Sequence, residues 1–235
     1  MGGNSAQDTS TGLKNRALGE VVNESSGKKI RIVFGLALAL GLPTLMMRKS
    51  EHEFIDRSHL IGYEIVWWAV VASVLLYVLF VERRPLSSVG YRRIGWSSVG
   101  IAVAAAVLLM AGLALIFYVV LPALHLTMAQ QVNKLLTLPL WCRLILVIRG
   151  VVAAELFYRG YGIERLQELT RSRAVAGITS CALFTLANAP SGGWASIIFA
   201  GFAGIILTVL YIWRRNVWVT MITHFVVDGV GVLTA

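Results

Sequence analysis

Two pairs of ionisable residues, each four positions apart, lie inside apolar stretches of this sequence. One pair is Glu155 and Arg159, and the other is His224 and Asp228. Residues four apart share one face of a helix, so each pair can interact along its own helix. A carboxylate and an imidazole can together perform general acid–base chemistry or position a reacting water. A charge at the centre of a bilayer costs roughly 2.5–3.5 kcal/mol on insertion scales, so such residues are functional candidates.

A further polar residue, Asn188, lies four positions after Phe184 in another apolar run. Each helical residue adds 1.5 Å, so Glu155 and His224 lie about 15 and about 14 Å from the charged flanks of their runs. By the same rise, Asn188 and Asp228 lie about 22 and about 20 Å deep. We therefore expect Glu155 and His224 at one level of the membrane, with the other two residues one helical turn further out.

Each of these residues also has a purely structural interpretation. The Glu–Arg pair could simply neutralise itself, and the His–Asp pair could be a hydrogen bond that holds helices together. Asn188 could be an interhelical hydrogen-bonding group. Three other charged residues are expected near the outer membrane surface. Glu64 is expected to extend toward the interface, and Arg143 and Arg149 to reach the interface or a backbone carbonyl.

The composition places these residues in a membrane protein. Of 235 residues, 57% are hydrophobic and 14% are charged, whereas a soluble domain averages about 45–50% and about 25%. This excludes an ordinary soluble enzyme and a disordered chain. The net charge is +9, and the basic residues cluster between apolar runs. This pattern indicates membrane orientation rather than a nucleic-acid partner. The two cysteines, Cys142 and Cys181, indicate neither a disulfide framework nor a zinc knuckle.

The predicted fold class is all-α, a polytopic transmembrane helical bundle of about seven spans. Residues 1–29 are polar and are predicted to be a disordered cytoplasmic tail; residues 30–235 are predicted to be the transmembrane domain. A span needs roughly 20 apolar residues. The candidate spans are Ile30–Met47, Ile61–Val81, Ser97–Leu121, Leu138–Tyr161, Ala174–Ala189, Trp194–Trp213 and Val217–Leu233.

Arginine and lysine concentrate in every second loop, which predicts a cytoplasmic N-terminus and an outer C-terminus by the positive-inside rule. The expected location is a bacterial-type cytoplasmic membrane, with membrane lipids as partners. Five tryptophans lie at predicted span ends and are expected to anchor the interfaces. The cytoplasmic charges are Lys28, Lys29, Arg31, Arg83, Arg84, Arg92, Arg93, Arg165, Arg171, Arg173, Arg214 and Arg215; the tryptophans are Trp96, Trp141, Trp194, Trp213 and Trp218.

Three short motifs in the C-terminal half resemble those of a known membrane family. Ala154, Glu155 and Arg159 resemble the Glu-Glu-x-x-x-Arg motif of the CPBP family, which contains CAAX prenyl endopeptidases and bacterial Abi or bacteriocin-processing proteins. Phe184 and Asn188 resemble its second motif, Phe-x-x-x-His. The motifs follow the family order, and the resemblance covers a core of about 139–235.

The third family motif, His-x-x-x-Asn or Asp, resembles His224 and Asp228. The resemblance implies an intramembrane endopeptidase that cuts membrane-associated or prenylated peptides, with Glu155, Arg159, His224 and Asp228 retained in the site. It also leaves open whether a divalent metal assists active relatives; no other cofactor is expected. The predicted cavity, with Arg159 at its edge, is lined by Ala154, Glu155, Asn188, His224 and Asp228.

Two positions depart from the family pattern. Ala154 replaces the first Glu and cannot accept a proton, and Asn188 replaces a His and cannot act as a base. Losing one general base typically costs about 10²–10⁴-fold in rate. We therefore expect an inactive or weakened endopeptidase. The alternatives are a non-catalytic membrane binding or scaffold protein, such as a pseudoprotease of immunity type, and a small ion-coupled transporter using the acidic and histidine residues as a proton relay.

The predicted topology can be tested with cysteines introduced at Ser10 and Thr234. From outside intact cells, an impermeant thiol reagent should label position 234 and leave position 10 protected, because the arginine-rich loops remain inside. Labelling at position 10 with protection at 234 would reverse the orientation.

Overall fold

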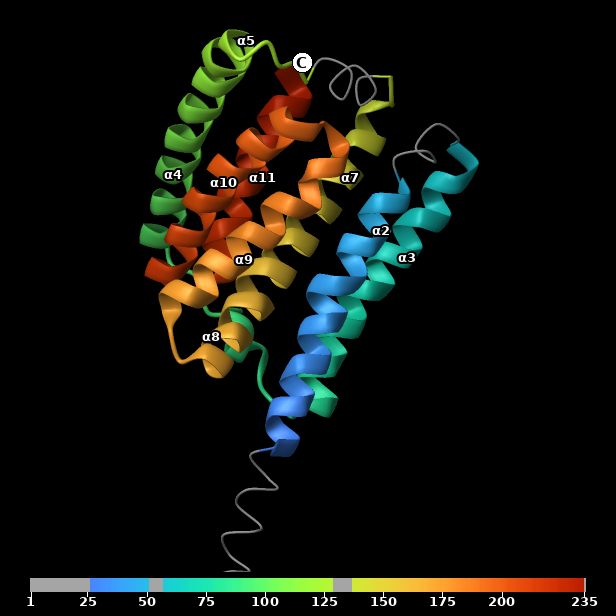
Figure 1. Ribbon diagram of the computed structural model, residues 1–235, viewed down its shortest axis with the longest axis vertical. Coiled ribbons are helices and arrows are strands. Elements are labelled where there is room, and N and C mark those ends of the chain that lie inside the picture. The colour runs from blue at the N-terminus through green and yellow to red at the C-terminus, as the bar shows by residue number, and fades with distance from the viewer. Residues whose placement is uncertain (1–25, 51–56, 129–136, 235) are drawn as a thin grey trace, which may run out of the picture.

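The computed structural model describes residues 26–50, 57–128 and 137–234, and within these ranges all regular structure is helical. Seven rods can be followed through them (Figure 1). The first begins at Ser26 and contains η1 (Ala37–Gly41) and α2 (Leu42–Ser50). The others are α3 (Arg57–Leu76) with η2 (Tyr77–Val81); α4 (Trp96–Leu115) with η4 (Ile116–Val120) and α5 (Leu121–Ala123); α7 (Leu140–Ala154) with η5 (Glu155–Ile163) and α8 (Glu164–Thr170); α9 (Arg173–Asn188); α10 (Gly193–Arg214); and α11 (Val217–Thr234).

The helices confirm an all-α membrane protein, while the count of seven spans is not confirmed. Four helices are long and apolar enough to cross a bilayer. The helix Val217–Leu233 is apolar but shorter. Two further rods are not among the candidate spans. The rod containing α7 carries several charged residues, and α9 has only 16 residues, about 24 Å of helix. The four qualifying helices are Ser26–Met46, Ile61–Val81, Trp96–Ala123 and Gly193–Arg214.

The first helix begins within the last residues of the predicted tail. Ser26 begins the first helix, so residues 26–29 are helical. The Lys28 ammonium, on that first turn, lies 3.5 Å from a Glu168 carboxylate oxygen on α8, a contact that hydrophobic periodicity cannot reveal. Residues 1–25 lie outside the described ranges.

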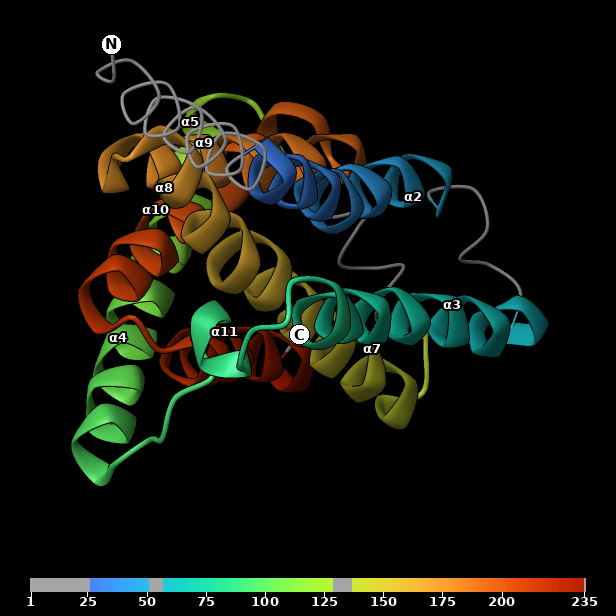
Figure 2. The same cartoon turned by 90° about the horizontal axis from the view of Figure 1, so that it is seen from below.

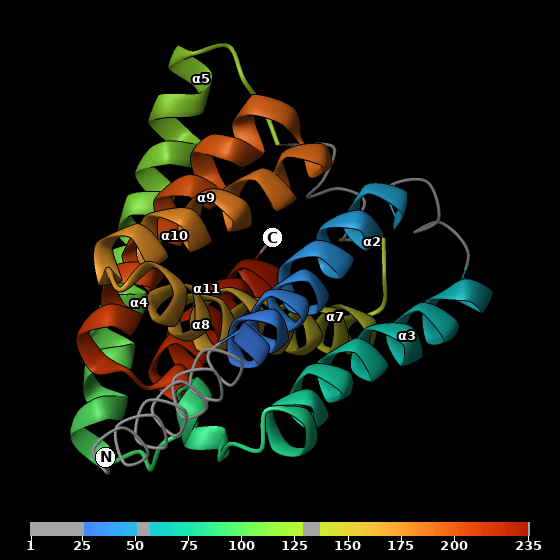
Figure 3. The ribbon, with the colours of Figure 1, turned by 60° about the horizontal axis from the view of Figure 1, so that its bottom comes forward.

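The rod formed by α7, η5 and α8 occupies the middle of the structure. Its η5 segment contacts η1 (Ala37–Gly41) of the first helix and also α9 and α11, while α7 contacts α3 and α11. Figures 2 and 3 show α2 and α3 on one side of this rod and α4, α9, α10 and α11 on the other. The central rod therefore joins the N-terminal helices to the C-terminal bundle.

Two glycines allow neighbouring elements to approach this rod closely. A Cβ at Gly35 would lie 1.8 Å from the Tyr161 hydroxyl, so only glycine lets the first helix dock there. A Cβ at Gly160 would lie 2.6 Å from the Val89 carbonyl oxygen, in the short helix η3 (Leu86–Val89). Both contacts bring polar atoms of one element against the backbone of another.

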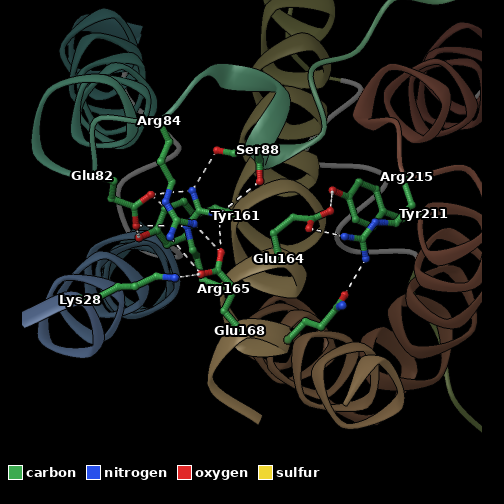
Figure 4. Close-up of polar contacts among 11 residues, drawn as sticks. Lys28, Glu82, Arg84, Ser88, Tyr161, Glu164, Arg165, Glu168, Tyr211 and Arg215 are labelled. Carbon is green, nitrogen blue, oxygen red and sulfur yellow. Dashed lines mark hydrogen bonds and ion pairs between the residues drawn. The ribbon is translucent and has the colours of Figure 1, made fainter. Parts of the chain in front are cut away.

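One end of the bundle is closed by ion pairs (Figure 4). Arg165 was expected among the cytoplasmic loop charges, but it is only 1% exposed. Its guanidinium lies 2.5 Å from a carboxylate oxygen of Glu82. The Tyr161 hydroxyl donates to the same carboxylate at 2.7 Å. Arg84 binds Glu168 through two hydrogen bonds. Burial would raise the pKa of Glu168, but the hydrogen bond from Arg84 and the nearby cations outweigh it and lower that pKa.

A second ion pair joins α3 to α7 within the apolar region. The Arg149 Nε donates to Glu64 Oε1 at 2.8 Å, and both residues are buried. The guanidinium also lies 5.0 Å from the ring centroid of Trp67. The expectation that Glu64 and Arg149 extend to the interface is therefore wrong, because each is the other's counter-charge. Arg143 does reach a carbonyl, that of Val232, at 3.1 Å.

We predict that Arg149→Met destabilises the folded protein by about 3–5 kcal/mol, because it leaves the Glu64 carboxylate buried and unpaired. The double variant Glu64→Leu with Arg149→Met should lose less than the single variant, since no buried charge remains. Unfolding of the purified protein in detergent measures both, with Arg93→Met at an exposed loop residue as the control. A double variant less stable than the single one would contradict this explanation.

Candidate functional site

The backbone changes its winding where the first candidate motif begins. The α-helix α7 ends at Ala154, and the following nine residues from Glu155 to Ile163 form a π-helix whose residues are all buried. π-helical turns are rare and occur frequently at functional sites. Glycines at positions 160 and 162 leave room beside the widened backbone, since a Cβ at Gly162 would lie 2.7 Å from the Phe157 carbonyl.

Four of the predicted residues form one chain of polar contacts between η5 and α11. Glu155 Oε1 lies 3.1 Å from Arg159 Nη1 and 2.8 Å from His224 Nδ1. His224 Nε2 lies 3.3 Å from Asp228 Oδ2. The two i, i+4 pairs seen in the sequence are therefore linked across two helices, with Glu155 and His224 at the same level.

The charges of these four contacting residues can balance one another. Glu155 and Arg159 are completely buried, whereas the side chains of His224 and Asp228 are 13% and 42% exposed. Both imidazole nitrogens of His224 face carboxylate oxygens, and an imidazole donates from both nitrogens only when it is protonated. When His224 is protonated, two carboxylates face one guanidinium and one imidazolium. In this arrangement neither nitrogen of His224 is available to accept a proton.

Arg159 lies fully buried at the inner end of this series of contacts, and its expected place at the edge of a cavity stays a prediction. Its guanidinium carbon lies 4.2 Å from the centroid of the Phe184 ring, and Nη2 donates to the Gly204 carbonyl at 3.4 Å. The π-helix and α9 enclose the side chain, which the depth count along a single helix cannot show. The aromatic face adds a cation–π contact to the ion pair with Glu155.

The two altered positions contribute differently. Ala154 is partly buried and packs against the apolar cluster that includes Leu156 and Phe184. The Asn188 side-chain amide donates to the Phe184 carbonyl at 2.8 Å. Neither supplies an acid or a base to the chain of contacts. Their assignment to the site stays a prediction based on the motifs.

One residue near the site was missed in the sequence. The Ser180 hydroxyl donates to the carbonyl of Tyr158 in the π-helix at 2.5 Å, and Ser180 is fully buried. The signal that could have indicated it is spacing, because Ser180, Phe184 and Asn188 follow one another at intervals of four on the same face of α9. This bond holds α9 against η5 beside Arg159.

The donor set does not fit a divalent metal ion. Within the described ranges, no group of three or more His, Cys, Asp and Glu side chains converges as a metal site. A catalytic zinc site uses about three protein ligands together with water. Here both nitrogens of His224 face carboxylate oxygens. In this arrangement neither nitrogen is free to bind a metal ion.

Comparison with known proteins gives one match. The sequence model of the family described as type II CAAX prenyl endopeptidase Rce1-like matches residues 135–230, which contain α7, η5, α9, α10 and most of α11. No curated protein and no solved structure gives a significant match. The matched stretch includes all three motifs described above.

We predict that Arg159→Met costs about 3–5 kcal/mol of folding stability, because the Glu155 carboxylate then loses a counter-charge in a fully buried position. Asp228→Asn should cost at most about 1 kcal/mol, since that carboxylate is partly exposed to solvent. Thermal or denaturant unfolding of both variants checks this order. Equal losses would show that burial does not determine the strength of these contacts.

Proposed function

We propose that this protein, whose residues 135–230 match the family model of Rce1-like type II CAAX prenyl endopeptidases, is an intramembrane endopeptidase scaffold with weakened or absent catalysis. The main supporting observation is the continuous series of polar contacts that runs from Asp228 through His224 and Glu155 to Arg159. Every group in it that could act as a base already holds a charged partner.

Peptide hydrolysis requires a base that removes a proton from water as the water attacks the scissile carbonyl. Ala154 has no proton acceptor, and the amide of Asn188 is not basic. Glu155 Oε1 lies within hydrogen-bonding distance of two donors, Arg159 and His224. The retained residues can therefore orient a bound peptide more readily than they can activate water.

Two buried atoms of the site, Glu155 Oε2 and Arg159 Nε, have no hydrogen-bond partner within the distance criterion among the described residues. A carboxylate oxygen can accept from a peptide N–H or from water, and a guanidinium nitrogen can donate to a carbonyl. A peptide or a water that reached these atoms would therefore find both an acceptor and a donor beside η5. Membrane-associated or prenylated peptides are the substrate class that the family name indicates.

A non-catalytic binding or scaffold protein is the second candidate function. It is favoured by position 188, where an amide that donates to the Phe184 carbonyl stands in place of the basic histidine of the family motif. Such a protein would hold a peptide, a lipid chain or a partner helix without cutting it. The experiment below separates this candidate from a weakened enzyme.

We further propose that the end of the bundle bearing the ion pairs faces the cytoplasm of a bacterial-type membrane. Lys28, Arg84, Arg165 and Arg215 come from four separate segments and lie together at this end (Figure 4). Concentration of basic residues on one side is the pattern of cytoplasmic loops. The tryptophans expected at the two interfaces are exposed, between 43% for Trp218 and 88% for Trp96.

The catalytic proposal predicts that Ala154→Glu combined with Asn188→His switches on cleavage of a prenylated CAAX peptide by the purified protein. The unmodified chain should cut at least about 100-fold more slowly, since a missing general base costs about 10²–10⁴-fold. Each single reversion should recover much less than the pair, because residues that act as a unit are non-additive. Product formation measured by mass spectrometry gives the rates.

The matched control is the double reversion with His224→Ala added, which should return the rate to that of the unmodified chain. If the unmodified chain cuts as fast as the double reversion, the assignment of position 154 as the base is wrong. A double reversion that binds the peptide without cutting it would support the scaffold protein.

A further inference from the structure

A pocket of about 170 Å³ opens beside the ion pairs, away from the motif residues. It is lined by Lys28, Arg31 and Ile32 of the first helix and by Glu82 and Arg84 just after η2. Figure 4 shows Lys28, Glu82 and Arg84 around this region. Three of the five lining residues are cations, so the pocket is built for a negative group.

Nearby carboxylates do not neutralise these cations. Glu82 is engaged by the buried guanidinium of Arg165, and Glu168 is shared by Arg84, Arg165 and Lys28. Together the pocket and its immediate partners contain four cations and two carboxylates. The excess of two positive charges favours an anion, and a phosphate group offers several oxygens that Lys and Arg side chains can contact together.

Two of the cations can turn toward a ligand without breaking a buried ion pair. Arg31 is exposed, and its Nε donates to the Gly27 carbonyl of its own helix at 3.3 Å. The Lys28 side chain is 58% exposed, and its contact with Glu168 is long, at 3.5 Å. Exposed pairs of this kind contribute little to stability, about 0–1 kcal/mol.

The surroundings of the pocket indicate a lipid as the source of the phosphate. Exposed apolar side chains lie on the same two helices, with Ile30 69%, Phe34 62% and Phe80 71% exposed. The Phe34 ring lies 5.8 Å from that of Tyr77 on η2, so the two helices pack side by side there. A cationic pocket between helix ends, continuous with membrane-facing apolar residues, is suited to a headgroup and its acyl chains.

We propose that this pocket binds the phosphate of an anionic phospholipid headgroup, with Lys28 and Arg31 as the principal contacts. The proposal does not depend on the proposed catalytic function. Arg84 holds Glu168 through two hydrogen bonds, so it shapes the pocket while staying in its ion pair.

The test titrates the purified full chain, in a neutral detergent, with phosphatidylglycerol and with phosphatidylcholine, and counts bound lipid by native mass spectrometry. Phosphatidylglycerol should bind more tightly. Each of Lys28→Gln and Arg31→Gln should weaken that binding by about fivefold, and the double variant by about 25-fold, from the usual contribution of one basic residue near a membrane surface.

Lys29→Gln is the matched control, because Lys29 is an exposed neighbour on the same helix that does not line the pocket. It should change the affinity by less than about twofold, because an exposed charge that does not contact the bound group is screened by salt. The charge-preserving variant Lys28→Arg with Arg31→Lys should retain binding, which shows that losses in the other variants reflect charge rather than misfolding.

Three results would overturn the proposal. They are equal affinity for the two lipids, an equal loss in the Lys29 control, and inorganic phosphate binding as tightly as phosphatidylglycerol. The last result would assign the pocket to a soluble anion.

Discussion

The Glu155 carboxylate is fully buried in an apolar bundle, and its need for positive partners organises the centre of this protein. A buried carboxylate must be paired or hydrogen-bonded to remain charged. Arg159 supplies one partner from the same helix, and His224 supplies another from α11. These contacts require η5 and α11 to meet at one level. Phe184 on α9 then covers the guanidinium, so three helices are fixed around a single charge.

The same rule governs the other charged residues inside the bundle. Arg149 and Glu64 pair between α3 and α7, and Arg165 and Glu82 pair where α8 meets the end of η2. Each pair joins an N-terminal helix to the central rod. Helices in a bilayer gain little from apolar contact with one another, because lipid is equally apolar. Ion pairs and close glycine contacts, such as that at Gly35, therefore position the N-terminal helices against the C-terminal helices.

The series of polar contacts around Glu155 also explains why the residues at positions 154 and 188 matter for the proposed function. An endopeptidase that activates water needs a base that is not already paired with a counter-charge and can accept a proton. Positions 154 and 188 are where the motifs place such groups. Ala154 packs among apolar residues and Asn188 bonds to its own helix. In the proposed function, the retained residues would bind a peptide, and positions 154 and 188 would be those that lack the reacting groups.

Much of this arrangement was determined by local pattern in the sequence. Apolar runs predicted the helices, and spacing of four predicted both pairs, because residues one turn apart on a helix must be neighbours. Equal depth predicted the meeting of Glu155 with His224. Other features depended on which helices pack together, which no single helix encodes. Glu64 and Arg149 are 85 residues apart, and neither could be assigned a partner from its own helix. Phe184 on α9 likewise covers the guanidinium of Arg159, and the burial of Arg165 follows from Glu82. A charge takes its partner from whichever helix packs beside it, so tertiary structure alone decided these contacts.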